Sequence, residues 1–349
     1  MSDLLKNILN SLGKFEGVEA NLGTSINLQS FVPYGVPTRI PSLDLAIRRP
    51  GLPCGRIVEL FGLPSSGKSS IGYSVLAQAQ RMGGLSILIE TERAFDALRA
   101  KQFGINLSAL GLVEVDTIET VFTTIQTVVD EVEAESQTGP TVIVVDSITG
   151  VESELNRSKD ITEESRVGED ARVIRKAIRK LADRVAKKNI LLIFVNHAIS
   201  KIGNSFGKQT TSSGGNAIKF WSSIRLELAN VSNVFDGSGD KRTRKGMVTN
   251  IRVEKNKVAA TGTIDFKVKL LNTGFDIEND LLDAMVKIEA VERENKLKYR
   301  YVPEDILFSR NEWPSLIDKL GGWDKVYSWF LKAAMKHDYM LPYGEGTKE

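Results

Sequence analysis

The residues with the clearest chemistry lie between positions 62 and 70. The pattern G-x4-G-K-S follows the apolar run "RIVELF" and precedes the helical pattern "SSIGYSVLAQAQ". A strand, a glycine-containing turn and a helix start are the context in which this pattern binds polyphosphate, because backbone N–H groups and the helix N-terminus face the anion. The predicted phosphate-binding loop consists of Gly62, Leu63, Pro64, Ser65, Ser66, Gly67, Lys68, Ser69 and Ser70.

Carboxylates that complete such a site follow two other apolar runs. In a nucleotide site of this kind, Lys68 reaches the β- and γ-phosphates and Ser69 ligates Mg²⁺. Asp146 ends the run "TVIVVD", where it can hold the same metal through water. Glu90 and Glu92 follow "LSILI", at the strand end that faces the γ-phosphate in sheets of this type.

Only one of these two glutamates is needed to orient or deprotonate an attacking water. Glu90 lies closer to the strand, which suits a structural role, but the residues alone leave both glutamates open as the base. A plain surface position is the alternative for either residue. A base at this place predicts hydrolysis of the nucleotide rather than binding alone.

Strands and helices that position these residues alternate from residue 56 onward. Near-continuous apolar strands separated by helices predict a parallel sheet covered on both faces. After residue 220 the strands follow one another without long helices, which predicts an antiparallel extension of the same sheet. Residues 276–349 form a small mixed section, with a helix pair around Gly321 and Gly322 and a helix start at Pro314.

Composition limits the classes of protein that the chain can be. Its 349 residues allow about two domains, and a net charge of +2 confines any nucleic-acid surface to a local patch. A single cysteine, Cys54, excludes an intramolecular disulfide and a cysteine-based zinc site. The N-terminus lacks a signal-peptide pattern, and no apolar run approaches the ~18 residues of a membrane span. We therefore expect a protein of a reducing cytoplasm; that the cell is bacterial or phage-infected is implied only by the family resemblance given below.

An apolar stripe near the N-terminus needs a partner surface. Leu4, Leu5, Ile8, Leu9 and Leu12 share one face of a predicted helix over residues 3–14, which a polar, glycine-containing connector follows. A helix this short cannot bury its own apolar face. It either folds back on its chain or docks on a neighbouring subunit.

Basic residues gather on one predicted helix and on one loop. Positions i, i+3, i+4, i+7 and i+8 of the helix place Arg172, Arg175, Lys176, Arg179 and Lys180 on one face. A solvated surface is the ordinary meaning of such a stripe. Here, however, the stripe directly follows the strand-end loop at residues 156–171. A second loop at residues 198–215 is rich in Gly, Ser and Thr and carries isolated apolar residues, which suits phosphate contacts and insertion between bases of single-stranded DNA.

Six segments in this order resemble the RecA recombinase family along most of residues 1–275. They read "GLPCGRIVELFGLPSSGKSS", "ILIETERAFDALRAKQFGI", "VIVVDSITG", "LLIFVNHAISKIGNSFG", "TTSSGGNAIKFWSSIRLEL" and "EKNKVAA". The resemblance implies a RecA-like P-loop ATPase core of α/β class, a mostly parallel twisted sheet with an antiparallel extension and helices on both faces. It also implies an N-terminal helix and linker at 1–32, the core at 33–275 and a small α+β domain at 276–349, which resembles the family only loosely.

The resemblance assigns roles around the nucleotide. Glu92 matches the residue that activates water. Asp96 falls where the family contacts adenine, and Arg99 stands where bacterial members stack a tyrosine on the base. Lys255 and Lys257 match a pair that reaches the neighbouring subunit's γ-phosphate, although two solvated charges on an edge strand are the alternative from pattern alone.

His197 departs from the bacterial pattern, which has glutamine as the sensor between γ-phosphate and DNA. Recombinases of large tailed phages are closer to this chain in having Asn-His there. A histidine can donate to a phosphate through one ring nitrogen and relay through the other, so His197 suits the sensor role. A histidine that caps a strand end is the alternative.

The resemblance also implies a DNA surface and a subunit interface. The DNA-binding positions are Val167, Arg172, Arg179, Ser200, Lys201, Ile202, Gly203, Ser213, Gly214 and Gly215, and Val167 and Ile202 match the residues that wedge between base triplets. Leu5, Ile8, Leu9 and Phe220 match positions at the interface between subunits.

The resemblance, together with these residues, implies an ATP-dependent, Mg²⁺-requiring recombinase. It would form a helical filament on single-stranded DNA, pair it with double-stranded DNA and exchange strands, with single-strand-binding and loader proteins as partners. Two alternatives stay open at this point. One is a ring-forming ATPase motor of helicase type, and the other is a recombination mediator that hydrolyses ATP poorly.

Overall fold

The computed structural model describes residues 34–134, 139–158, 168–200, 210–212, 216–237, 242–260 and 264–343, together with positions 8, 11 and 14. Structural statements below concern these residues. Ile8 has helical backbone and is 45% exposed. The other residues of the predicted N-terminal stripe, including Leu5 and Leu9, lie outside the described part of the chain. None of the described helices combines the length and apolarity that a membrane crossing needs.

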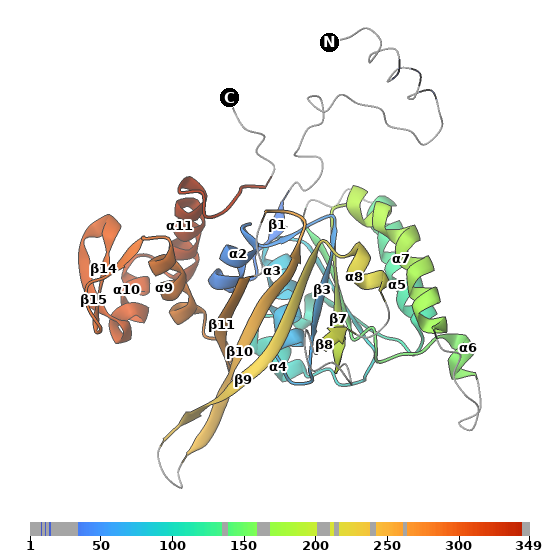
Figure 1. Ribbon diagram of the computed structural model, residues 1–349, viewed down its shortest axis with the longest axis horizontal. Helices are drawn as coiled ribbons and strands as arrows, with labels where there is room; N and C mark the ends of the chain where they lie inside the picture. The colour runs from blue at the N-terminus through green and yellow to red at the C-terminus, as the bar shows by residue number, and fades with distance from the viewer. Residues whose placement is uncertain are drawn as a thin grey trace.

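One large sheet forms the centre of the molecule, with the strand order β12-β11-β10-β9-β3-β7-β6-β4-β5 (Figure 1). Its parallel strands are β3 (Arg56–Gly62), β4 (Leu85–Glu90), β5 (Leu110–Glu114), β6 (Thr141–Asp146), β7 (Ile190–Ser200) and β9 (Ile224–Asp236). Its antiparallel extension is β10 (Thr243–Asn256), β11 (Ile264–Leu271) and β12 (Gly274–Phe275), and β8 (Thr210–Ser212) pairs with β7. The predicted parallel sheet and its antiparallel extension are both confirmed.

Strand β5 has no counterpart among the sequence predictions. It lies at the edge of the sheet, where most of its side chains are exposed or only half-buried. An edge strand with a solvated face lacks the continuous apolar run that reveals the buried strands.

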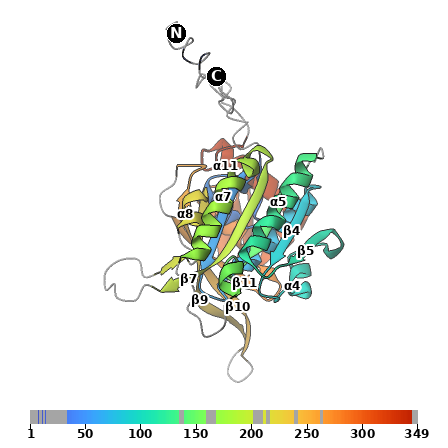
Figure 2. The same cartoon turned by 90° about the vertical axis from the view of Figure 1, so that its right-hand side faces the viewer.

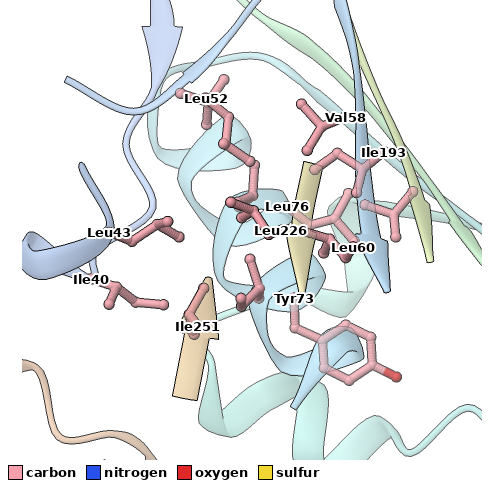
Figure 3. Close-up of a cluster of buried hydrophobic side chains, with 14 of the residues drawn as sticks. Ile40, Leu43, Leu52, Val58, Leu60, Tyr73, Leu76, Ile193, Leu226 and Ile251 are labelled. Atoms are coloured by element: carbon pink, nitrogen blue, oxygen red, sulfur yellow. The ribbon is translucent and has the colours of Figure 1, made fainter. Parts of the chain in front are cut away.

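Helices cover both faces of the sheet (Figures 1 and 2). On one face lie α2 (Pro41–Ile47) and α3 (Lys68–Arg81), and on the other lie α5 (Ile118–Ala134), α7 (Glu169–Lys187) and α8 (Ala217–Trp221). Strand β3 supplies both cores because its side chains alternate: Val58 and Leu60 pack with Leu76 of α3, as Figure 3 shows, and Ile57 packs toward α7. Shorter elements are β1 (Gly35–Val36), β2 (Leu52–Pro53), α4 (Ala97–Gln102), η2 (Leu107–Ala109) and α6 (Glu154–Arg157).

The C-terminal section has a separate core. It contains α9 (Ile277–Lys287), a three-stranded sheet of β13 (Val291–Arg293), β14 (Lys298–Tyr301) and β15 (Ile306–Ser309), α10 (Trp313–Lys319), α11 (Trp323–Lys336) and the turns η4 (Val302–Glu304) and η5 (Arg310–Glu312). The predicted helix pair is confirmed, with Pro314 in the first turn of α10. Gly321 and Gly322 both have positive φ, which lets the chain turn sharply between the two helices.

Two buried carboxyl groups join this section to the main sheet domain. Asp44 of α2 is fully buried, and it accepts hydrogen bonds from the Thr38 hydroxyl at 2.9 Å and from the Tyr327 hydroxyl of α11. Asp280 of α9 accepts from the backbone N–H of Ser42 at 2.8 Å. Burial raises the pKa of Asp44 to about 7 and that of Asp280 to about 6.

We expect the difference in Tm between Asp44→Asn and the wild type to be more favourable to the variant at pH 8 than at pH 5. A carboxyl group whose pKa is raised in the folded state favours folding while it is protonated, and this contribution is lost as pH rises through about 7. Asparagine does not ionise, so it lacks this loss. Thermal unfolding of both proteins at pH 5 and pH 8 measures the effect, with exposed Asp183→Asn as the control. An equal difference in Tm at the two pH values would contradict the assignment.

Candidate functional site

Four of the residues predicted to act on the nucleotide or its metal, Lys68, Glu92, Asp146 and His197, meet at one edge of the sheet. Parallel strands end on the same side, and the register places Gly62 of β3 beside His197 of β7, and Glu90 of β4 beside Asp146 of β6. The phosphate-binding loop leaves β3 at this edge. Strand alignment therefore brings together residues that are far apart in the chain.

The loop needs its two glycines. At Gly67, with φ of 97°, a Cβ would lie 3.1 Å from Leu270 Cδ2. At Gly62, a Cβ would lie 2.1 Å from the carbonyl oxygen of Leu228. Larger residues would force the loop away from β9 and β11, and the backbone N–H groups would lose their common direction.

The phosphate-binding loop carries hydrogen-bond donors that suit a negatively charged ligand. Lys68 is 6% exposed, and its Nζ donates to the carbonyl oxygens of Gly62 at 3.1 Å and Leu63 at 2.9 Å. Burial lowers the pKa of Lys68, while the charges of Asp146 and Glu92 oppose that shift. The buried Ser66 Oγ has no hydrogen-bond partner within the described residues. Since a buried polar group without a partner is costly, these donors suit a polyphosphate.

Ser69 and Asp146 form a pair that fits a magnesium ion. The Ser69 hydroxyl hydrogen-bonds the carboxylate of Asp146, and burial raises the pKa of Asp146 while that bond opposes the shift. Among the described residues, no group of three His, Cys, Asp or Glu side chains gathers as a metal cluster. One hydroxyl and one carboxylate are the protein ligands of an ion that keeps several waters and binds phosphate, as Mg²⁺ does.

Glu92 is held by two neighbours that face it. The Ser147 hydroxyl donates to Glu92 Oε1 at 2.6 Å, and His197 Nε2 lies 3.1 Å from the same oxygen. The hydrogen bond from Ser147, followed by the one from His197, lowers the pKa of Glu92 although partial burial opposes it. Glu90 is only 5% exposed, whereas the side chain of Glu92 is 43% exposed. This favours Glu92 as the residue that water can reach.

A cavity of about 430 Å³ continues from the phosphate-binding loop, which is enough for a small ligand. Arg99 borders it, and its Nη1 donates to the carbonyl oxygens of Leu271 at 3.2 Å and Asn272 at 2.5 Å. Asp96, predicted to contact adenine, caps α4 by accepting from the N–H of Arg99, and it is not among the residues that line the cavity. The lining residues that the sequence predictions missed are Arg244, Gly246, Met247, Leu270, Leu271 and Asn272.

The predicted lysine pair lies away from this cavity. Lys255 of β10 pairs with Arg225 of β9, and Arg225 pairs with Glu59 of β3. Glu59 lies three residues, or about 10 Å, before Gly62 at the end of β3. Its Nζ donates to the carbonyl oxygens of Lys219 and Phe220 in α8, on the face of the sheet opposite α3. Burial and the nearby Lys257 lower the pKa of Lys255 to about 8.

An exposed aromatic ring lies beside the two lysines. Phe220 is 70% exposed, and Lys257 Nζ lies 5.9 Å from its ring centre. Neither lysine borders the cavity beside the phosphate-binding loop. Lys255, Lys257 and Phe220 together form a cationic and apolar surface, here called the α8 patch.

The basic stripe on α7 is exposed at all five positions, Arg172, Arg175, Lys176, Arg179 and Lys180. Arg172 makes an ion pair with Glu169, its Nη2 at 2.6 Å from Oε1. Most other predicted DNA contacts, namely Val167, Lys201, Ile202, Gly203, Ser213, Gly214 and Gly215, lie outside the described residues. The second predicted loop spans residues 198–215, but both of its ends contain strand. Strand β7 continues to Ser200, and it pairs with β8 through Ala198 and Ser212.

We expect Ser147→Ala to raise the pKa of Glu92. The Ser147 hydroxyl is the strongest stabiliser of the Glu92 carboxylate, so its loss favours the protonated form. Titration of side-chain ¹³C-labelled glutamate by NMR, with Glu92→Gln to assign the signal, measures the shift. Thr149→Val is the control, since Thr149 contacts Ser147 at 3.3 Å but not Glu92. An unchanged Glu92 titration in Ser147→Ala would contradict this assignment.

Comparison with known proteins identifies the family of the chain. The RecA N-terminal domain family matches residues 3–275. Protein RecA of Methylococcus capsulatus is 35% identical over 259 residues, covering 74% of this chain and 71% of the relative, and that of Rhodospirillum rubrum is 34% identical over 272 residues, covering 78% and 70%. Protein RecA of Borrelia duttonii is 31% identical over 303 residues, covering 84% and 81%. With a phosphate-binding loop, a carboxylate pair and strand ends arranged as described, the chain belongs to the RecA family.

Proposed function

We propose that this protein is a DNA-stimulated ATPase that assembles on single-stranded DNA and promotes strand exchange. Membership of the RecA family makes it a recombinase and an ATPase. The observation that carries the proposed mechanism is the separation of two sets of charged groups. The phosphate-binding loop lies at the carboxyl edge of the sheet. The α8 patch lies on another surface of the same subunit, away from the cavity beside that loop.

Binding of ATP falls to the phosphate-binding loop and the adjoining cavity. Backbone N–H groups of the loop and the Lys68 ammonium would hold the β- and γ-phosphates, with the free hydroxyl of Ser66 as a further donor. Arg99 would lie against the base, since it borders the cavity and also stacks on Phe103 at 4.8 Å. Ser69 and Asp146 would hold Mg²⁺, which when bound neutralises negative charge on the phosphates.

Proton removal from the attacking water is assigned to Glu92. Its lowered pKa keeps the carboxylate ionised at neutral pH, and its exposed side chain accepts from Ser147 and His197 on one oxygen, which leaves the other for water. His197 would relay the state of this carboxylate along β7. That strand ends at Ser200, and residues 201–209, which follow it in the sequence, belong to the predicted DNA loop.

The α8 patch would complete the site of a neighbouring subunit. Lys255 and Lys257 are cations beside an exposed aromatic ring. Such a surface suits contact with a neighbouring subunit, in which the ring packs and the lysines bind that subunit's nucleotide phosphate. Lys255 now donates to the carbonyl oxygens that end α8, and a γ-phosphate is a stronger acceptor for the same ammonium. Such a contact would make hydrolysis depend on assembly.

DNA is proposed to contact the exposed basic face of α7 and the two predicted loops. Phosphate contacts of this kind carry no sequence information, so the protein would bind many sequences. The proposed organisation is residues 1–32 for assembly, 33–275 for the ATPase core and 276–349 for a C-terminal domain, whose own hydrophobic core supports the last boundary. Single-strand-binding and loader proteins are proposed partners from the family alone.

Glu92→Gln should retain ATP binding but slow DNA-stimulated turnover by at least ~10²-fold, which is the usual contribution of a general base. Phosphate release with and without single-stranded DNA measures turnover, and equilibrium binding of ATP measures retention. Glu114→Gln, an exposed glutamate at the end of β5, is the control. Turnover of Glu92→Gln at the wild-type rate would remove this residue from the mechanism.

Mixing two inactive variants tests whether sites are shared. Lys68→Ala keeps the α8 patch, and Lys255→Ala/Lys257→Ala keeps its phosphate-binding loop, so each should be inactive alone. A cation supplied by a neighbour is worth ~10³–10⁵ in rate in other phosphoryl-transfer enzymes. Mixed on single-stranded DNA, some interfaces pair an intact loop with intact lysines, and partial ATPase activity should return.

The control mixes Lys68→Ala with the triple variant Lys68→Ala/Lys255→Ala/Lys257→Ala, in which no intact loop exists and no activity should return. Electron microscopy establishes that both subunits enter the same assembly and whether it is a filament or a ring. Inactivity at every ratio in mixed filaments would show that the lysines do not act between subunits. Closed rings would favour a helicase-type motor.

A further inference from the structure

Arg244 is a cation beside the phosphate-binding loop that no step above uses. It borders the same cavity as Lys68, Ser69 and Arg99, although it lies far from them in the chain. It belongs to the ribbon of β9 and β10, which extends beyond the other strands of the sheet in Figure 1. Arg244, the second residue of β10, therefore reaches the nucleotide site from the antiparallel extension of the sheet.

An irregularity in the ribbon directs this side chain. Arg244 pairs with Phe235 and Gly246 pairs with Val234, so Lys245 is an extra residue with no partner in the register. Such a bulge bends a strand and re-aims its side chains, and it is often found beside functional sites. Here it separates two adjacent cations: Lys245 forms an ion pair with Asp236 at 3.6 Å, while Arg244 borders the cavity.

Hydrogen bonding distinguishes Arg244 from the other cations of the cavity. Lys68 donates to two loop carbonyls, and Arg99 donates to two carbonyls at the end of β11. Within the described residues, the side chain of Arg244 makes a single long contact, from Nε to the carbonyl oxygen of Gly246 at 3.4 Å. The two terminal nitrogens of its guanidinium are thus available for a ligand in the cavity.

The position of Arg244 in the cavity indicates which part of a bound nucleotide would lie nearest to it. The carboxylates assigned to the metal and the attacking water, Asp146 and Glu92, do not border this cavity, whereas Lys68 and Ser69 do. The wall that carries Arg244 is joined to the loop by the Thr249 hydroxyl, which donates to the carbonyl oxygen of Ser66 at 3.2 Å. A guanidinium in this cavity, which Arg99 and the start of α3 also line, would face the phosphates nearer the ribose.

We propose that Arg244 binds the α- and β-phosphates of the nucleotide within its own subunit. A guanidinium matches two phosphate oxygens with two parallel hydrogen bonds, which a lysine does not. Because these phosphates are present in both ATP and ADP, Arg244 acts in binding and not in the transfer of the γ-phosphoryl group. This inference rests on the proposed use of ATP.

Arg244→Gln tests the proposal through binding of Mg²⁺–ADP to the full chain, measured by isothermal titration calorimetry without DNA. We expect Kd to rise about tenfold, the usual worth of a hydrogen-bonded charge, and KM for ATP to rise by a similar factor while kcat changes less than about twofold. Arg244→Lys should recover part of the affinity. Arg242→Gln is the control, since that arginine of the same ribbon stacks on Phe235 and does not border the cavity.

An unchanged Kd in Arg244→Gln would overturn the inference, whether or not kcat falls. Lys68→Ala separates this failure from failure of the proposed function. If Lys68→Ala loses ADP binding and Arg244→Gln does not, only the role of Arg244 is wrong. If Lys68→Ala binds ADP as the wild type does, the nucleotide site and this inference both fail. Circular dichroism and Tm of each variant establish that it is folded.

Discussion

The parallel register around β3 is the constraint on which the site depends. Gly62, Asp146, His197 and Glu90 come from four different strands, and none of them is held near another by a short loop. They meet because the strands end at one edge, with Gly62 level with His197 and Glu90 level with Asp146. A shift of one residue in any pair would turn each side chain to the opposite face and dismantle the site.

A buried polar network supports that register. Glu59, in the middle of β3, is fully buried, and it accepts from Arg225 Nε of β9 at 2.5 Å and from Asn196 Nδ2 of β7 at 2.9 Å. Misalignment of either neighbour would leave a charge buried without its partner, which costs about 3–5 kcal/mol where such pairs are broken. Arg225 also lies over the ring of Phe61, 4.5 Å from its centre. We infer that this network helps to align three strands beneath the phosphate-binding loop.

Sequence patterns predicted the sheet and the nucleotide loop because those signals are local. A glycine-rich turn between a strand and a helix is contiguous, and buried parallel strands are apolar along their whole length. The cavity wall formed by Met247, Leu270 and Asn272 could not be predicted in the same way. Those residues owe their position to the antiparallel pairing of β10 with β11, which has no signature at the residues themselves. Ser147 was similarly overlooked, since a serine after a strand is common and only its 2.6 Å contact with Glu92 gives it a role.

The placement of the α8 patch away from the phosphate-binding loop gives any assembly of these subunits a polarity. If each loop is completed by the next subunit's lysines, the contact is heterologous, and such contacts build open chains unless the rotation closes a ring. An open chain then has two chemically different ends. At one end a loop binds nucleotide without a neighbour's cations and hydrolyses slowly, and at the other end a pair of lysines has no phosphate to meet. The terminal subunits therefore differ in nucleotide state from the interior, and addition and loss of subunits need not be equal at the two ends.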